Sequence, residues 1–391
     1  MYRLLFLSCL LLLTKYSFSQ GISYNKGGTK VKDYFLEIPY QDISGKLIIK
    51  VQLNHVDYNF LFDTGAPTCL STKVRDAINA DKQAEGRVND VNGNQASQPT
   101  VVIKDIALGN LHFYDTPAIV GVPEFFQCWN VDGILGSNLL RNSIVQINSN
   151  KKTIIITDQA EKLQLDIKSS ANLSLDTVQS YPVFNAKLAD NSTLPISFDT
   201  GDSGLLSLSD QSMQQLKKSN VFESITKGYG ANQVGFFGLE KYNQKFLLKF
   251  PEINIGGIQL KNVMTVTDKG SGARMGSKLL AYGIVTIDFV NRNFYLQSDN
   301  KKIDVAEKTW PFQPTFNNNK LVVGLVWSEA GNSVVQGEQI VDVDGTSYAD
   351  VDLCHLLNNK PILEGKEQAT ITLRSEKGEL RKIKVEKNIF K

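Results

Sequence analysis

The stretch Phe62-Asp63-Thr64-Gly65 decides how this chain folds, and it occurs a second time as Phe198-Asp199-Thr200-Gly201. Each copy follows an apolar run, Tyr58–Phe62 or Leu194–Phe198, that predicts a β-strand. A glycine after a strand allows the backbone to turn sharply, so the aspartate before it can project into a cleft. Two such turns facing each other would place the carboxylates of Asp63 and Asp199 side by side.

A pair of facing carboxylates has a definite chemistry. Like charges at short distance do not both ionise easily, so one pKa rises and the pair titrates as a unit. The ionised member then acts as a general base toward water, and the protonated member polarises a carbonyl group. Thr64 and Thr200 offer hydroxyls that hold the turns, while Gly65 and Gly201 let the turns approach each other.

A second repeat lies downstream of each turn. Gly136-Ser137-Asn138-Leu139-Leu140 is matched by Gly276-Ser277-Lys278-Leu279-Leu280, and each is followed after three residues by Ile-Val-x-Ile. Ser71 and Ser209 each precede a short helix-like stretch that they could cap. The pattern predicts a duplicated domain with two β-rich lobes, residues 20–165 and 166–300, joined by a polar linker near residues 159–176.

With these motifs the chain resembles the aspartic proteases of the pepsin and retropepsin kind, in particular exported bacterial members with a C-terminal PDZ domain. The matching residues are Asp63-Thr64-Gly65-Ala66, Asp199-Thr200-Gly201 and Ile134-Leu135-Gly136. The resemblance implies a mainly β fold, a bilobal acid protease of two duplicated retropepsin-like β-barrel lobes. It also implies that Asp63 and Asp199 hydrolyse peptide bonds in extended peptide or protein substrates. No cofactor is implied, and a monomer suffices because both lobes lie in one chain.

The sequence departs from the pattern of that family at three places. Asp202 follows the second turn, where the family has a small or hydroxyl residue. Arg274-Met275-Gly276, the counterpart of Ile134-Leu135-Gly136, keeps one of its two apolar residues. The predicted tip of the first flap contains Asn92, Gly93 and Asn94 and has no tyrosine. A glycine-rich stretch, residues 228–238, predicts a second, mobile flap.

The last 80 or so residues, 310–391, resemble a PDZ domain. The resemblance rests on Glu329-Ala330-Gly331, on Gly337-Glu338-Gln339-Ile340 and on Val343-Asp344-Gly345. It implies that a peptide ligand adds a strand beside Leu321, Val322 and Val323. The alternative is a domain that only packs against the protease.

The N-terminus predicts a signal peptide over residues 1–19, cleaved near Ser19/Gln20, and hence export to the periplasm or the extracellular space. Arg3 supplies the positive start, and Leu4–Leu13 is a short apolar run. An uncleaved anchor is the alternative. Three cysteines would remain, and Cys69 and Cys128 could form a disulfide. The alternative is three buried thiols, with Cys354 as the third.

Several other function classes receive little support. The 391 residues carry a net charge of +2, which does not favour nucleic acid as a partner. The three histidines, His55, His112 and His355, have no metal-ligand spacing, so no metal is expected. Gly201-Asp202-Ser203-Gly204 spells a serine-protease motif, but Ser203 lacks a histidine in a suitable local sequence. The main alternative to a protease is a non-catalytic exported peptide-binding protein on the same fold.

Overall fold

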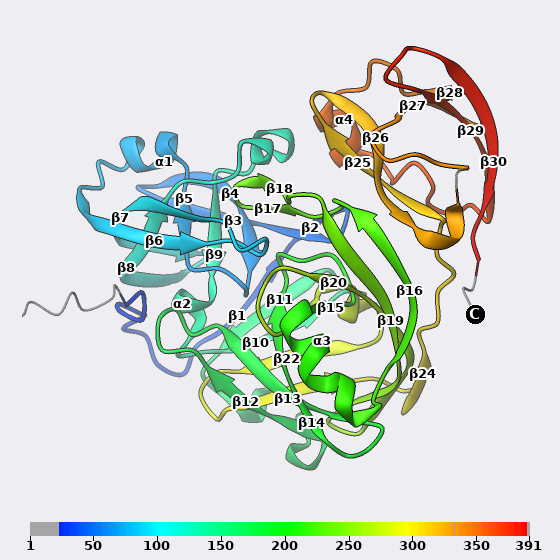
Figure 1. The fold of residues 1–391 in the computed structure, drawn as a ribbon. Coiled ribbons are helices and arrows are strands. Elements are labelled where there is room, and N and C mark those ends of the chain that lie inside the picture. Colours follow the sequence, from blue (N-terminus) through cyan, green and yellow to red (C-terminus); the bar gives the residue numbers. More distant parts are fainter. Residues whose placement is uncertain (1–22, 332, 389–391) are drawn as a thin grey trace, which may run out of the picture.

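The computed structural model describes residues 23–331 and 333–388, and its fold is mainly β, as the sequence predicts (Figure 1). The predicted signal peptide lies outside the described residues. No helix in the described ranges is long and apolar enough to cross a membrane. Two β units and a sheet between them form the body of the molecule, and a C-terminal unit, residues 310–388, is attached at one side (Figure 1).

The first β unit is an eight-stranded sheet. In sheet order its strands are β2 (Gln41–Ile43), β3 (Lys46–Leu53), β4 (Val56–Asp63), β9 (Gly133–Gly136), β5 (Cys69–Leu70), β8 (Leu111–Val120), β7 (Gln95–Leu108) and β6 (Lys82–Asn89). Its helices are α1 (Thr72–Ala77), α2 (Ser137–Leu140) and the 3-10 turn η1 (Glu124–Trp129). Ser71 caps α1 by accepting a hydrogen bond from the Val74 amide, which confirms the predicted cap.

The second β unit lies between residues 182 and 304. Its strands are β13 (Pro182–Leu188), β14 (Thr193–Asp199), β15 (Leu206–Ser209), β16 (Glu223–Gly230), β19 (Asn243–Ile255), β20 (Ile258–Asp268), β21 (Ala273–Gly276) and β24 (Lys302–Asp304). Between β16 and β19 lies the small hairpin of β17 (Val234–Gly235) and β18 (Gly238–Leu239). The helical segments are α3 (Asp210–Leu216), η4 (Lys217–Ser219) and η5 (Ser277–Ala281). Ser209 caps α3 through the Ser212 amide, also as predicted.

A bridging sheet joins the two units. In order its strands are β1 (Phe35–Pro39), β11 (Thr153–Thr157), β10 (Ile144–Asn148), β22 (Ile284–Asp288), β23 (Asn293–Gln297) and β12 (Ser170–Leu175). The two Ile-Val-x-Ile runs pair with each other here, because β10 and β22 are antiparallel neighbours. One continuous hydrophobic core extends through both units, so the body is held as one packed structure.

The predicted linker near residues 159–176 is more ordered than expected. It holds the 3-10 turns η2 (Ala160–Lys162) and η3 (Ile167–Ser169) and the strand β12. Leu173 and Ala171 alternate with exposed residues along β12 and are buried, while the strand pairs with β13 and β23. The polar composition of this segment did not predict a strand, because only alternate residues of β12 face the core.

The C-terminal unit has a hydrophobic core of its own, which includes Phe312, Val323, Ile340 and Ile371. Its elements are β25 (Phe312–Asn317), β26 (Lys320–Trp327), η6 (Ser328–Ala330), β27 (Gln339–Val343), β28 (Thr346–Ser347), α4 (Leu353–Asn358), β29 (Gln368–Arg374) and β30 (Leu380–Glu386). Its sheet continues into the second β unit, because Leu325–Trp327 of β26 pair with Gly228–Gly230 of β16.

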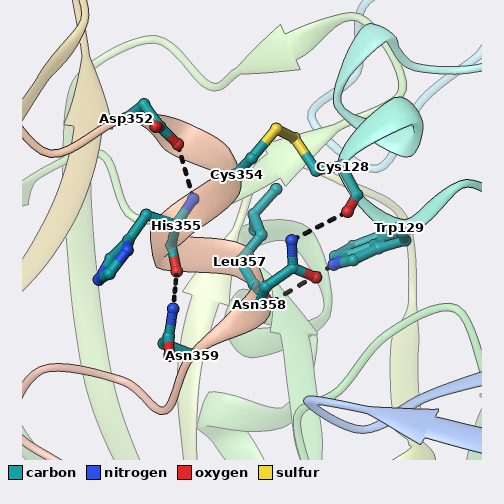
Figure 2. Close-up of a disulfide and its surroundings, with 8 residues drawn as sticks. All are labelled: Cys128, Trp129, Asp352, Cys354, His355, Leu357, Asn358 and Asn359. Carbon is teal, nitrogen blue, oxygen red and sulfur yellow. Dashed lines mark hydrogen bonds between the residues drawn. A yellow bond between two sulfur atoms is a disulfide. The ribbon is translucent and has the colours of Figure 1, made fainter.

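A disulfide joins the C-terminal unit to the first β unit (Figure 2). Cys354 on α4 is bonded to Cys128 on η1, so the predicted pair Cys69–Cys128 is wrong. Cys69 lies on β5 inside the core with 2% of its surface exposed, as a free thiol. Two hydrogen bonds accompany the bridge: Asn358 Nδ2 donates to the Cys128 carbonyl at 2.9 Å, and Trp129 Nε1 to the Leu357 carbonyl at 3.4 Å.

Candidate active site

The two Asp-Thr-Gly turns lie at the ends of equivalent strands. Asp63 is the last residue of β4, which runs parallel to β9 with Asp63 opposite Gly136. Asp199 is the last residue of β14, which runs parallel to β21 with Asp199 opposite Gly276. In both cases the parallel neighbour fixes the strand end, so the position of each aspartate is set by backbone pairing.

Reciprocal hydrogen bonds lock the two turns together. The Thr64 hydroxyl donates to the Phe198 carbonyl at 2.7 Å and accepts from the Thr200 amide at 3.1 Å. The Thr200 hydroxyl donates to the Phe62 carbonyl at 2.7 Å and accepts from the Thr64 amide at 3.1 Å. Both threonines are fully buried, which makes these bonds costly to break. The turns that the sequence predicted to face each other are therefore joined directly.

The glycines of the turns leave room for the opposite carboxylate. A Cβ atom on Gly65 would lie 2.3 Å from Cγ of Asp199, and one on Gly201 would lie 2.3 Å from Oδ2 of Asp63. Any other residue would therefore collide with the opposing aspartate. Each glycine amide also donates a hydrogen bond to the aspartate two residues before it: Gly65 to Asp63 Oδ1 at 2.8 Å, and Gly201 to Asp199 Oδ1 at 2.9 Å.

The pKa values of both carboxyl groups of this pair are raised. Burial raises the pKa of Asp63 well above its ordinary value, and the nearby charge of Asp199 raises it further. Burial also raises the pKa of Asp199, although the Arg274 guanidinium opposes this rise. Neighbouring carboxylates do not both ionise easily, so ionisation of one group opposes ionisation of the other.

Charged residues around Asp199 form a network that the sequence did not reveal. Arg274 Nε donates to Asp202 Oδ2 at 2.8 Å and lies 3.7 Å from Asp199 Oδ2. The same guanidinium donates through Nη2 to Asp268 Oδ2 at 3.2 Å. The only sequence signals were Asp202 and Arg274 as departures from the family pattern; nothing pointed to Asp268. On the other side, Lys46 Nζ donates to the Gly201 carbonyl.

The predicted flap tip is a tight turn organised by Asp90. Its Oδ1 accepts hydrogen bonds from the amides of Asn92 and Asn94, both at 2.9 Å, and Gly93 has a φ of +77°. This φ favours glycine because a Cβ is strained there. The tip connects β6 and β7, and Asn92, Gly93 and Asn94 lie at its end.

The flap tip touches the β17–β18 hairpin of the second unit. Asn92 Nδ2 donates to the Gly238 carbonyl at 3.2 Å, and the Phe237 amide donates to Asp90 Oδ2 at 3.2 Å. Phe236 packs into a hydrophobic cluster of the first unit that contains Ala66 and Val88. Segments from both units thus meet, and Phe236 of the second unit joins a hydrophobic cluster of the first.

The predicted peptide-binding strand of the C-terminal unit has neighbours on both edges. Leu321, Val322 and Val323 lie on β26 and pair with Phe316, Thr315 and Pro314 of β25. On the other edge Val322 pairs with Gln339, and the Val323 amide donates to the Glu338 carbonyl at 2.9 Å. The backbone groups of Val322 and Val323 are therefore paired on this edge as well.

Comparisons with known proteins agree with this geometry over one part of the chain. Residues 49–139 match the family model of aspartyl proteases. The matched segment contains the first Asp-Thr-Gly turn and Ile134-Leu135-Gly136, the two elements that β4 and β9 bring together. No curated protein matches the sequence.

Many solved structures resemble the chain, among them the following three. An aspartic proteinase from Irpex lacteus has 13% identity and a TM-score of 0.41, covering 68% of this chain and 97% of that one. Basic 7S globulin from soybean has 12% identity and a TM-score of 0.37, with coverages of 68% and 95%. A retropepsin-like aspartic protease from Rickettsia conorii has 18% identity and a TM-score of 0.24, with coverages of 34% and 94%.

Proposed function

We propose that this protein is an aspartic endopeptidase with Asp63 and Asp199 as its catalytic residues. The observation that carries the proposal is the joining of the two Asp-Thr-Gly turns by reciprocal threonine hydrogen bonds. The family match over residues 49–139 supports the same reaction class. One chain supplies both aspartates, so a monomer is sufficient.

The reaction needs no group beyond the two carboxyls and a water molecule. The ionised carboxylate takes a proton from water, whose oxygen attacks the carbonyl carbon of the scissile peptide bond. The other carboxyl gives its proton to the carbonyl oxygen as the tetrahedral intermediate forms. When the C–N bond breaks, the first carboxyl protonates the leaving nitrogen and the second recovers its proton from a hydroxyl of the intermediate. The substrate is an extended peptide or protein segment.

The test is cleavage of a quenched peptide library between about pH 3 and 8, the range over which a carboxylate pair titrates. Asp63→Asn and Asp199→Asn should each lose at least about 100-fold in kcat/KM, the lower end of what general acid–base catalysis contributes. Asp105→Asn is the matched control, because Asp105 is exposed and pairs with His112. Full activity in both dyad variants would refute the aspartic mechanism, and binding without cleavage by the wild type would favour a peptide-binding protein.

We propose that residues 310–391 form a PDZ-type unit that helps to present substrate to the protease. Its separate core and its sheet pairing with β16 support a docked module beside the flap region. Because both edges of β26 are occupied near Leu321, its peptide ligand would bind elsewhere on the unit.

We also propose that the chain is exported with cleavage near Ser19/Gln20. The charged start and short apolar run support this, and so does the Cys128–Cys354 disulfide, which persists in oxidising compartments. N-terminal sequencing of the mature protein from fractionated cells checks the proposal. A chain that begins at Met1 and stays in the cytosol would contradict it.

A further inference from the structure

The two aspartates occupy equivalent backbone positions in unlike surroundings. In the first unit, Leu61 of β4 pairs with Ile134 of β9; in the second, Ser197 of β14 pairs with Arg274 of β21. Each pair lies two residues before its aspartate, so Arg274 stands where the first unit has Ile134. Ile134 is buried and apolar, while Arg274 is a buried cation with 6% of its surface exposed. The charge is therefore placed beside one member of the pair.

Arg274 acts on Asp199 at short range. Its Nε lies 3.7 Å from Asp199 Oδ2, and both side chains are at most 10% exposed. An ion pair at this distance inside a protein is screened far less than a surface pair. Asp202 and Asp268 hold the guanidinium in place by accepting hydrogen bonds from Nε and Nη2. With its geometry fixed from two sides, the cation stays beside Asp199 rather than moving toward Asp63.

We propose that Arg274 is a positioning residue that makes Asp199 the ionised member of the pair and leaves the shared proton on Asp63. This inference rests on the proposed function and adds to it an assignment of roles. Asp199 is then the base that takes the proton from water, and Asp63 is the acid that protonates the substrate carbonyl oxygen. After C–N cleavage, Asp199 gives its proton to the leaving nitrogen, and Asp63 is protonated again.

Other charged groups near Asp63 and Asp199 raise or lower the pKa values of these two carboxyl groups. Asp202 has a pKa below its ordinary value, because the Arg274 charge and hydrogen bond outweigh the effect of burial. As an anion it opposes part of the effect of Arg274 on Asp199. Lys46 favours ionisation of both Asp63 and Asp199, so it does not distinguish them. The remaining titratable groups that face the pair are Asp268, Tyr181 and Cys69.

The experiment compares the pH dependence of kcat/KM in wild type, Arg274→Gln and Asp202→Asn. Loss of the cation raises the pKa of Asp199, so the acid limb of Arg274→Gln should move to higher pH. We expect about a tenfold loss at the acid end, which corresponds to about one pKa unit. Loss of the Asp202 anion should move the acid limb to lower pH. Opposite shifts from two residues in contact are not produced by general damage to the site.

Two further variants make the result decisive. Arg274→Lys keeps the charge and should restore the wild-type acid limb more closely than Arg274→Gln does. Arg381→Gln is the matched control, because it removes an arginine–carboxylate pair with Glu338 in the C-terminal unit. If Arg274→Gln does not fold, Asp202→Asn alone tests the sign of the effect.

The outcomes separate this inference from the proposed function. Dyad-dependent cleavage with an unshifted acid limb in folded Arg274→Gln, or a shift of Asp202→Asn to higher pH, would overturn the role of Arg274. Wild-type cleavage that survives Asp63→Asn would overturn the aspartic mechanism itself.

Discussion

At the scale of single residues, the hydroxyls of Thr64 and Thr200 stabilise the two Asp-Thr-Gly turns. Thr64 and Thr200 are fully buried, and each hydroxyl makes one bond as donor and one as acceptor across the interface of the two units. Removing a hydroxyl therefore leaves two buried backbone groups without partners. Such groups cost about 1–3 kcal/mol each.

We expect Thr200→Val to lower the free energy of unfolding by about 2–4 kcal/mol, because it deprives the Phe62 carbonyl and the Thr64 amide of their partner. Thr200→Ser is the control, since it keeps the hydroxyl and loses one methyl group. Urea denaturation measures both values. Equal losses in Val and Ser variants would show that the hydroxyl contributes little.

The raised pKa of Asp63 predicts a gain in stability when its charge is removed. A carboxyl whose folded-state pKa is raised stabilises the fold below its unfolded pKa, and this contribution is lost as the pH rises through the folded pKa. Asp63→Asn does not titrate, so its free energy of unfolding should exceed that of wild type at pH 7. At about pH 3, below the ordinary aspartate pKa, the two proteins should differ least. Denaturation at both pH values measures this, and a difference that shrinks as pH rises would contradict the sign.

The sequence predicted these residues because their chemistry is local. Asp63-Thr64-Gly65 and its second copy each combine a strand end, a glycine and a carboxylate within four positions. The surroundings of Asp199 are different, since Arg274 and Asp268 reach it only through the pairing of β14 with β21 and the end of β20. Sequence separation hides such contacts.

At the scale of elements, the flap tip of the first unit contacts the β17–β18 hairpin of the second unit. Asp90 takes part in both, because Oδ1 holds the tip and Oδ2 accepts from the Phe237 amide. Surface loops of this kind open more easily than the core.

We expect Asp90→Ala to weaken the contact between the flap tip and the β17–β18 hairpin. The amides of Asn92, Asn94 and Phe237 lose their acceptor, so their hydrogen exchange should accelerate, while the amides of β4 stay protected. Glu85→Ala on β6 is the control, because Glu85 lies at the surface and pairs with Lys82 and Ser97. Unchanged exchange at Phe237 in Asp90→Ala would argue against a contact between flap and hairpin.

At the scale of the whole molecule, the C-terminal unit is fastened to both β units. Its strand β26 extends the sheet of the second unit through β16, where a Cβ on Gly230 would lie 2.1 Å from the Gly324 carbonyl oxygen. The Cys128–Cys354 bond fastens it to the first unit. A domain held at two places moves less freely than one on a linker.

We expect Cys354→Ser to lower the free energy of unfolding by about 2–5 kcal/mol, the usual cost of losing a disulfide. Reductant should bring the wild type to the same value and leave Cys354→Ser unchanged. Cys69→Ala is the control for loss of a cysteine outside the bridge, and it should keep its response to reductant. Thermal unfolding with and without reductant measures all three, and a wild type that ignores reductant would contradict the bridge.

The sequence did not predict how the C-terminal unit is attached to the two β units. Cys128 and Cys354 are 226 residues apart and lie in different units, so spacing favoured the nearer Cys69. The pairing of β16 with β26 likewise depends on how two independently cored units dock. Patterns within each unit are local, and the predicted strand Leu194–Phe198 matches β14 (Thr193–Asp199) to within one residue at each end.

The Cys128–Cys354 bond also determines what happens when the chain is cut. Together with the backbone from residue 128 to residue 354 it closes a covalent ring that contains the whole second β unit. A single nick anywhere in that ring, including the exposed segment near residues 298–301, leaves two fragments that still form one covalent molecule. The C-terminal unit therefore stays covalently attached after proteolysis at such a site, and a reductant removes that covalent link.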